Sequence, residues 1–128
     1  MITAGLLLTG CSTVVMEASL SENPTYYVLS STKGDVKSIF STSDEKVTLR
    51  VVFKPNFVGT YRTFNVEWVK PGGDVYLSEN AKTSWGSNET LLVSMNIAKS
   101  EPARMPGQWR VRLRYKDEIL TDRPFTIE

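Results

Sequence analysis

Four cations near the C-terminus have the types and spacing that most clearly suggest chemistry. They lie at alternate positions of the segment 108–116, Gln-Trp-Arg-Val-Arg-Leu-Arg-Tyr-Lys, and are Arg110, Arg112, Arg114 and Lys116. Side chains two residues apart in a β-strand point to the same face of a sheet, so we expect one cationic face. Arginine binds carboxylates and phosphates through paired hydrogen bonds. The face is therefore either a solvated surface neutralised by acids of neighbouring strands, or a docking surface for an acidic partner, an anionic glycan or lipid phosphates.

Aromatic side chains form a second candidate set. Phe57 and Tyr61 fall in an expected loop, Tyr76 on a short edge strand, and Trp85 in the loop segment 83–88. Exposed aromatic rings beside amide groups can stack on sugar rings, and aromatic residues also anchor protein interfaces. For Trp85 a third role is open, in which its ring caps one end of the hydrophobic core. Sugar binding, protein binding and core packing thus remain alternatives for this set.

The sequence argues against the common catalytic and metal-binding arrangements. It has no histidine and one cysteine, which excludes a Ser-His-Asp triad, a Cys-His dyad, an internal disulfide and a zinc cluster. The carboxylates are scattered or lie in expected turns, and the pair Gly72-Gly73 belongs to a Pro-Gly-Gly-Asp turn. Basic residues number 15 against 14 acidic residues, a balance that does not favour nucleic-acid binding. We therefore expect no catalysis, no metal ion, no cofactor and no nucleic-acid partner.

The single cysteine has a distinctive context. The run from Leu6 to Cys11 reads Leu-Leu-Leu-Thr-Gly-Cys. It resembles the lipobox of bacterial lipoproteins, which reads Leu, then Ser, Thr or Ala, then Gly or Ala, then Cys. The resemblance covers the first dozen residues and implies that the Cys11 thiol carries a diacylglycerol and that the chain is cleaved before this residue. Two or more acyl chains give stable anchoring on a membrane.

This resemblance divides the chain and places it in the cell. Residues 1–10 would be the remnant of a signal peptide whose basic part lies upstream, residues 11–24 the lipidated cysteine and a tether, and residues 25–128 a β-sandwich domain. The segment 14–16, Val-Val-Met, leaves open a first strand within the expected tether. No stretch reaches the roughly 18 apolar residues of a transmembrane helix. Ser12 follows the cysteine in place of Asp, which in this family favours the outer membrane of the bacterial cell envelope.

Short alternating segments separated by turn signals predict a series of β-strands. The expected strands are 46–54, 63–70, 75–77, 89–97, 108–116 and 119–127, with weaker candidates at 26–29 and 36–40. Alternation places Trp68 and Trp109 toward the core. Pro124 lacks an N–H donor, so it should lie at an edge or a bulge.

The strand pattern predicts an all-β fold of two packed antiparallel sheets, because no window shows a helical period. The segment 106–127, Pro-Gly-x-Trp-x-Val-x-Leu…Phe-x-Ile, follows an earlier buried Trp and resembles the last hairpin of immunoglobulin-like and fibronectin type III-like sandwiches. The resemblance covers residues 45–128. The inter-sheet cysteine pair of antibody domains is absent, so packing alone must hold the sheets together.

An immunoglobulin-like strand order also predicts neighbours for the cationic face. The strands that flank segment 108–116 would supply Glu67, Asp122 and Glu128 as cross-strand partners. Surface ion pairs of this kind contribute about 0–1 kcal/mol each.

These features predict a lipid-anchored, non-catalytic interaction or assembly module of the bacterial cell envelope. It would dock on a partner protein of an envelope complex through a sheet face or an edge strand. The alternative, from a different class, is a carbohydrate-binding module for an envelope or extracellular glycan. Substitution of Trp85 by Ala would separate the two, because the glycan alternative depends on this ring.

Overall fold

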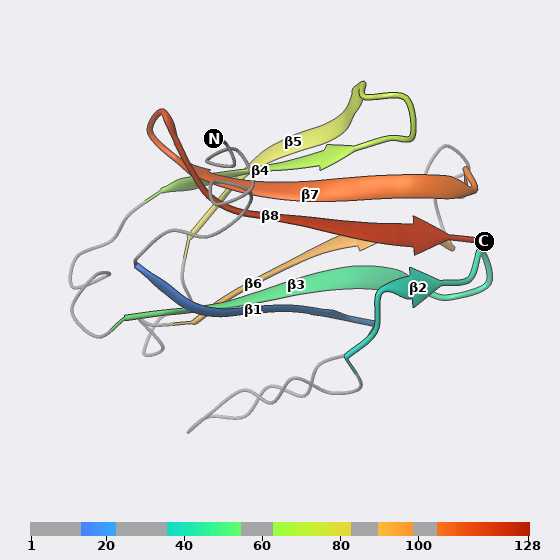
Figure 1. Ribbon diagram of the computed structural model, residues 1–128, viewed down its shortest axis with the longest axis horizontal. Coiled ribbons are helices and arrows are strands. Elements are labelled where there is room, and N and C mark those ends of the chain that lie inside the picture. The colour runs from blue at the N-terminus through green and yellow to red at the C-terminus, as the bar shows by residue number, and fades with distance from the viewer. Residues whose placement is uncertain (1–13, 23–35, 55–62, 83–89, 99–104) are drawn as a thin grey trace, which may run out of the picture.

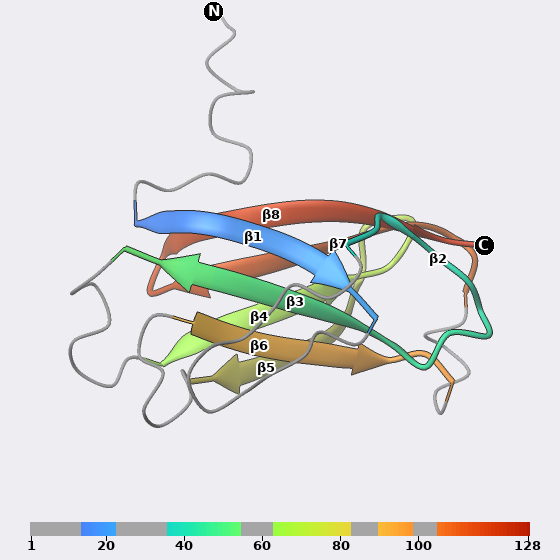
Figure 2. The ribbon, with the colours of Figure 1, turned by 90° about the horizontal axis from the view of Figure 1, so that it is seen from below.

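Two β-sheets packed face to face make up the fold (Figures 1 and 2). The structure, a computed structural model, describes residues 14–22, 36–54, 63–82, 90–98 and 105–128. The strands in this part are β1 Val15–Ser21, β2 Ile39–Phe40, β3 Lys46–Phe53, β4 Phe64–Val69, β5 Val75–Ala81, β6 Thr90–Asn96, β7 Gly107–Tyr115 and β8 Glu118–Ile127. The small sheet has the order β1-β3-β6 and the large sheet the order β2-β8-β7-β4-β5. The predicted all-β, two-sheet sandwich is confirmed.

Neighbouring strands are antiparallel, except that the two-residue β2 runs parallel to β8. The five longest predicted strands correspond to β3, β4, β6, β7 and β8. The short strand expected at 75–77 is the beginning of the longer β5. Of the two weaker candidates, 36–40 contains β2, whereas 26–29 lies outside the described residues.

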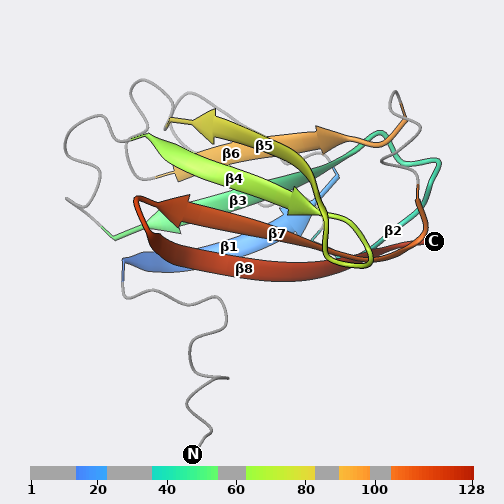
Figure 3. The same ribbon diagram turned by 90° about the horizontal axis from the view of Figure 1, so that it is seen from above.

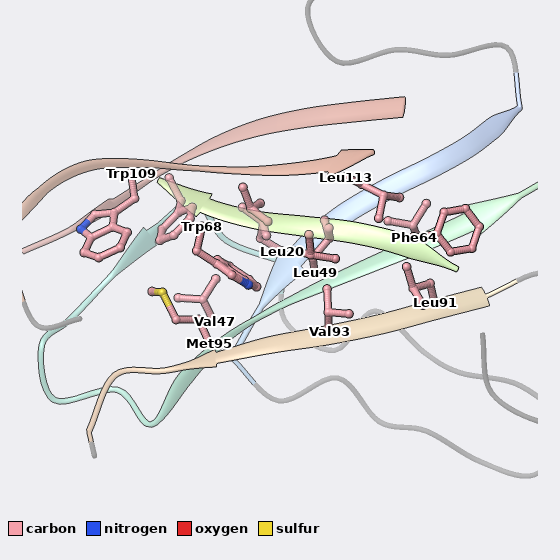
Figure 4. Close-up of a cluster of buried hydrophobic side chains, with 14 of the residues drawn as sticks. Leu20, Val47, Leu49, Phe64, Trp68, Leu91, Val93, Met95, Trp109 and Leu113 are labelled. Atoms are coloured by element: carbon pink, nitrogen blue, oxygen red, sulfur yellow. The ribbon is translucent and has the colours of Figure 1, made fainter. Parts of the chain in front are cut away.

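The core lies between the sheets and is filled by the inward-facing side chain of every second residue (Figure 4). In β3, alternate residues from Val47 to Phe53 are fully buried, as their spacing predicts. Trp68 and Trp109 are also fully buried, and Phe125 lies with its ring centroid 6.1 Å and 6.2 Å from theirs. Burying a large apolar side chain contributes about 1.5–3 kcal/mol, so this packing contributes strongly to holding the sheets together.

β4 has the place of the third strand of an immunoglobulin fold, where antibody domains carry a buried Trp packed on a disulfide. Trp68 is the corresponding buried Trp here. The two strands that an antibody domain joins by a disulfide are β3 and β7, which instead place Leu49 and Val111, both fully buried, in the core. The cysteine of the sequence, Cys11, lies outside the described residues.

The expected tether is wrong over residues 15–21, which form the first strand. β1 pairs with β3 in antiparallel register, with Leu20 opposite Leu49, and Leu20 is buried. The segment has the polar composition of a tether because an edge strand needs few apolar residues. One of its polar residues, Glu17, instead pairs with Arg50 of β3 at 2.9 Å. The small sheet therefore begins at Val15, as the alternative strand interpretation of 14–16 held.

Residues 36–40 join the edges of the two sheets through the backbone. The N–H of Lys37 donates to the carbonyl of Leu20 in β1 at 3.0 Å, and the N–H of Thr126 in β8 donates to the carbonyl of Ser38 at 2.9 Å. This crossing segment is therefore hydrogen-bonded to both sheets within a few residues.

Pro124 lies on the outer edge of β8, as predicted. Backbone groups alternate along a strand, so Pro124 faces the same side as Thr126, whose N–H donates to Ser38. β2 pairs with β8 only at Thr126 and Ile127. An N–H at position 124 would point beyond the end of β2. No strand of the described part lies there to accept a hydrogen bond from it, so proline is tolerated.

A close contact between two turns fixes one end of the large sheet. Gly107, the first residue of β7, has a φ of +136°, and a Cβ atom there would lie 2.7 Å from Cγ of Pro71. Pro71 begins the predicted Pro-Gly-Gly-Asp turn between β4 and β5, which the hydrogen bond from Lys70 N–H to Asp74 C=O closes at 2.8 Å. Glycine is required at 107 both for its backbone conformation and for this approach.

Candidate functional site

The outward surface of the large sheet carries the predicted cations. Arg110, Arg112 and Arg114 extend from β7, and Glu67 and Asp122 from the flanking strands β4 and β8; we call these five residues the arginine face. Figure 3 looks onto the sheet from this side. The residues between the arginines are inward and buried. The predicted alternation of the three arginines and the predicted neighbours Glu67 and Asp122 are therefore confirmed.

Both carboxylates of the arginine face are bound diagonally. Arg112 is the residue directly opposite Glu67 in β4 and directly opposite Asp122 in β8. Even so, Nε of Arg114 donates to Oε1 of Glu67 at 3.1 Å, and Nε of Arg110 donates to Oδ1 of Asp122 at 2.7 Å. Arg110 and Arg114 thus bind the two carboxylates that lie beside Arg112.

Arg112 is left at the centre of the face with an unused donor. Its Nε atom is buried and has no hydrogen-bond partner in the described part of the chain. Three guanidinium groups face two carboxylates here, so the face has one positive charge in excess. A buried donor without a partner costs about 1–3 kcal/mol. A carboxylate supplied from outside would neutralise this excess charge.

Exposed apolar side chains surround this charged centre. The strand register places Ile39 of β2, Val75 of β5 and Ile119 of β8 on the outward side of the large sheet. Their exposed fractions are 57%, 47% and 36%. Apolar groups at the margins and cations at the centre give this surface features that can contact a protein partner.

Two parts of the predicted cationic face are wrong. β7 ends at Tyr115, and Lys116 lies in the two-residue turn to β8 with a φ of +55°. Its ammonium group lies 5.4 Å from the ring centroid of Tyr115 and so is not aligned with the arginines. Glu128 follows the end of β8, beyond Ile127, which stands opposite Gly107. It is therefore too far along the sheet to pair with the arginine face.

The expected exposed aromatic on the edge strand is half-buried. A bulge in β5 inserts Tyr76 between the residues paired with Trp68 and Val69. The bulge turns the Tyr76 ring toward the core, where its centroid lies 5.8 Å from that of Trp109 at an angle of 84°. The other three candidate aromatics, Phe57, Tyr61 and Trp85, lie outside the described residues, as does the lipidation candidate Cys11.

An edge groove, which the sequence did not predict, opens between β1 and β8. Its volume is about 490 Å³, and its lining residues are Leu20, Val36, Lys37, Ser38, Arg123 and Pro124. Its signal in the sequence is weak, because the groove depends on where β2 stops along β8. Since Pro124 offers a carbonyl but no N–H, this edge lacks one of the donors that an added strand would use.

An ion cluster stabilises the crossing segment beside the groove. The ammonium group of Lys37 lies 2.8 Å from Oδ2 of Asp44 and 3.9 Å from Glu22. The N–H of Ser41 donates to the same Asp44 oxygen at 2.9 Å. The hydrogen bonds from Lys37 and Ser41 hold the pKa of Asp44 below its ordinary value of 3.8. The charge of Lys37 is therefore already engaged within the domain.

The described residues offer neither a cluster of metal ligands nor a membrane-spanning helix. No group of three or more His, Cys, Asp or Glu side chains in this part is arranged to hold a metal ion. The same part of the chain contains no helix that is long and apolar enough to cross a membrane.

Comparison with known proteins supports the fold alone. No family model matches the chain, and no curated protein sequence matches it either. Among solved structures, it is similar to an immunoglobulin-like protein from Pseudomonas aeruginosa, with a TM-score of 0.55 and 11% identity over 88% of this chain and 97% of that one. It also aligns with a β-glucosidase from Kluyveromyces marxianus, with a TM-score of 0.42 and 14% identity over 93% of this chain and 15% of the enzyme. The sandwich is immunoglobulin-like.

Proposed function

We propose that this protein is a non-catalytic interaction module of a bacterial cell envelope. A lipid on Cys11 holds it on the membrane, and the arginine face docks it on an acidic surface of a partner protein within a larger complex. The Leu-Thr-Gly-Cys motif supports the anchor. The unused donor and the excess charge at Arg112 support the docking face, and this is the observation that carries the proposal.

The sheet face suits docking better than the edge of β8. At Arg112 a partner carboxylate would meet a guanidinium whose two neighbouring carboxylates already pair with Arg110 and Arg114, so it would add a complementary charge. The edge has lost one N–H at Pro124. Of the aromatic residues proposed to bind a glycan, Tyr76 lies within the described part. Its ring packs on Trp109 and so is not free to stack on a sugar. We therefore propose the protein-docking function first.

The test of docking is a charge reversal at the centre of the face. Arg112→Glu and a matched control in the turn after β4, Lys70→Glu, are expressed as lipoproteins and extracted from membranes with mild detergent. We expect the unaltered protein and the Lys70 variant to migrate in a larger assembly, and the Arg112 variant to migrate alone. If the unaltered protein also migrates alone, or if all three stay in the assembly, docking through the arginine face is refuted.

The anchor is tested separately. Cys11→Ala should abolish acylation and move the protein from the membrane fraction to the soluble fraction, whereas Arg112→Glu should remain on the membrane. Mass spectrometry of the intact protein reports the lipid directly. A Cys11→Ala protein that still fractionates with membranes in the absence of its partner would contradict the lipid as its sole attachment.

A further inference from the structure

The strand register brings one set of strand ends together at the end of the sandwich where β1 begins. Val15 in β1 stands opposite Phe53, the last residue of β3. Across the core, the Phe53 ring stacks on Phe64 at the start of β4, with centroids 5.1 Å apart. Phe64 in turn is opposite Ala81, the last residue of β5. We call this the anchor end; it lies at the left of Figure 1 and also contains the β7–β8 turn.

The proposed lipid attaches very close to this end. Three residues separate Cys11 from Val15, the first residue of β1, so four Cα–Cα steps join them. An extended chain spans at most about 3.6 Å per residue, so the two Cα atoms are no more than about 14 Å apart. β7 has nine residues and at about 3.4 Å per residue spans roughly 30 Å. A tether of this length can reach the anchor end from the bilayer surface but holds the opposite end well away from it.

Charge differs between the two ends. The strand ends and turns of the anchor end carry three exposed lysines and two exposed acids, namely Lys54, Lys82, Lys116, Asp117 and Glu118. The same positions at the opposite end carry three lysines and five acids, namely Lys37, Lys46, Lys70, Glu22, Asp44, Glu45, Asp74 and Glu128. An anionic lipid surface attracts nearby lysines and repels carboxylates. The sign of this asymmetry favours the anchor end facing the membrane.

Exposed apolar side chains do not distinguish the two ends. Met16 and Ile119 lie near the anchor end, whereas Ile39, Val75 and Met105 lie near the opposite end. Tether length and charge are therefore the features that favour one end.

We propose that the anchor end rests on the anionic surface of the bilayer, so that the lipid on Cys11 fixes the orientation of the sandwich as well as its location. This inference depends on the lipid anchor proposed above. In this orientation the strands point away from the membrane. The arginine face then lies on the side of the domain and does not face the bilayer. Arg112 is then accessible to a partner in the same membrane-bound complex.

The experiment measures membrane proximity at both ends of the lipidated protein. A spin label is placed at Lys82→Cys at the anchor end or at Asp74→Cys at the opposite end; acylated Cys11 does not react with the label. The protein is reconstituted on phosphatidylcholine vesicles with or without phosphatidylglycerol. Collisions with lipid-soluble oxygen and with a water-soluble nickel chelate report the depth of each label. We expect the label at 82 to be shielded from nickel, more so with phosphatidylglycerol, and the label at 74 to be fully accessible.

Charge variants separate this inference from the anchor itself. Lys54→Glu with Lys116→Glu should expose the label at 82 while the protein stays on the vesicles, and the matched pair Lys46→Glu with Lys70→Glu should leave it shielded. Equal accessibility at 82 and 74 in a vesicle-bound protein would overturn the orientation and leave the anchor standing. A chain that does not acquire a lipid would instead refute the anchor.

Discussion

Glu67 accepts a hydrogen bond at 3.1 Å from Arg114, although Arg112 is the arginine directly opposite it in the sheet. On the other side of β7, Asp122 behaves in the same way toward Arg110. The sheet thus neutralises its outer cations and leaves the central one without a carboxylate. This selective pairing is the feature that supports the docking proposed at Arg112.

Removal of the central arginine should cost little stability. In Arg112→Ala, the two diagonal ion pairs remain. Removing an unpaired buried donor and relieving repulsion from Arg110 and Arg114 are offset by the lost packing of the aliphatic stem of Arg112. In Asp122→Ala, three guanidinium groups face one carboxylate. We expect the free energy of unfolding, measured with urea, to change by less than about 0.5 kcal/mol for Arg112→Ala and to fall by up to about 1 kcal/mol for Asp122→Ala. A larger loss at Arg112 would assign this residue a structural role instead.

Gly107→Ala should be strongly destabilising for two reasons that can be separated. The φ of +136° strains any residue with a Cβ, and that atom would lie 2.7 Å from Cγ of Pro71. We expect a loss of about 2–3 kcal/mol in the free energy of unfolding. Adding Pro71→Gly removes the contact but not the backbone strain. The double variant should therefore lose less than the two single losses added together; strict additivity would mean that the contact is unimportant.

The two core tryptophans differ in their indole N–H groups. Nε1 of Trp109 donates to the carbonyl of Met105 at 2.9 Å, whereas Nε1 of Trp68 is buried without a partner in the described part. Replacement by Phe removes similar volume at both sites but sacrifices a hydrogen bond only at 109. We expect Trp109→Phe to be more destabilising than Trp68→Phe by about 1–2 kcal/mol in parallel urea titrations. Equal losses would show that packing alone decides the cost.

Asp44 should make the domain less stable in acid. Its pKa in the folded protein lies below 3.8 because of the hydrogen bonds from Lys37 and Ser41, so the folded state favours the carboxylate. The resulting stabilisation is complete above the ordinary pKa and is lost as the pH falls through the lower folded value. We expect the difference in unfolding free energy between the unaltered protein and Asp44→Asn to be constant down to about pH 4 and to shrink below it. A difference independent of pH would rule out this ion pair as the cause.

Strand prediction succeeded where both sides of a strand are constrained. In β3 the alternate residues from Val47 to Phe53 are apolar because both β1 and β6 flank it and the core covers one face. β1 was mistaken for a tether because it is an edge strand with one fully inward Leu20 and several polar residues. An alternation of apolar and polar residues is too weak in β1 to predict a strand. β1 is instead placed by its backbone pairing with β3, which the side-chain pattern does not report.

The arginine face shows the same limit at the level of side chains. A period of two places Arg110, Arg112 and Arg114 on one side of the sheet, and an immunoglobulin-like order identifies Glu67 and Asp122 as neighbours. The choice of a diagonal partner depends on side-chain torsions, which no sequence pattern contains. Lys116 and Tyr76 were misplaced by a turn and a bulge, and each of these shifts the alternation by a residue.

The crossing segment has a consequence for how this domain is made. Lys37 and Ser38 tie β1 to β8 through backbone hydrogen bonds, so the sheets are connected without sulfur chemistry. A reductant should leave the melting temperature unchanged, and folding needs no oxidant or thiol-exchange catalyst. The one thiol of the chain is thereby available for another chemistry altogether.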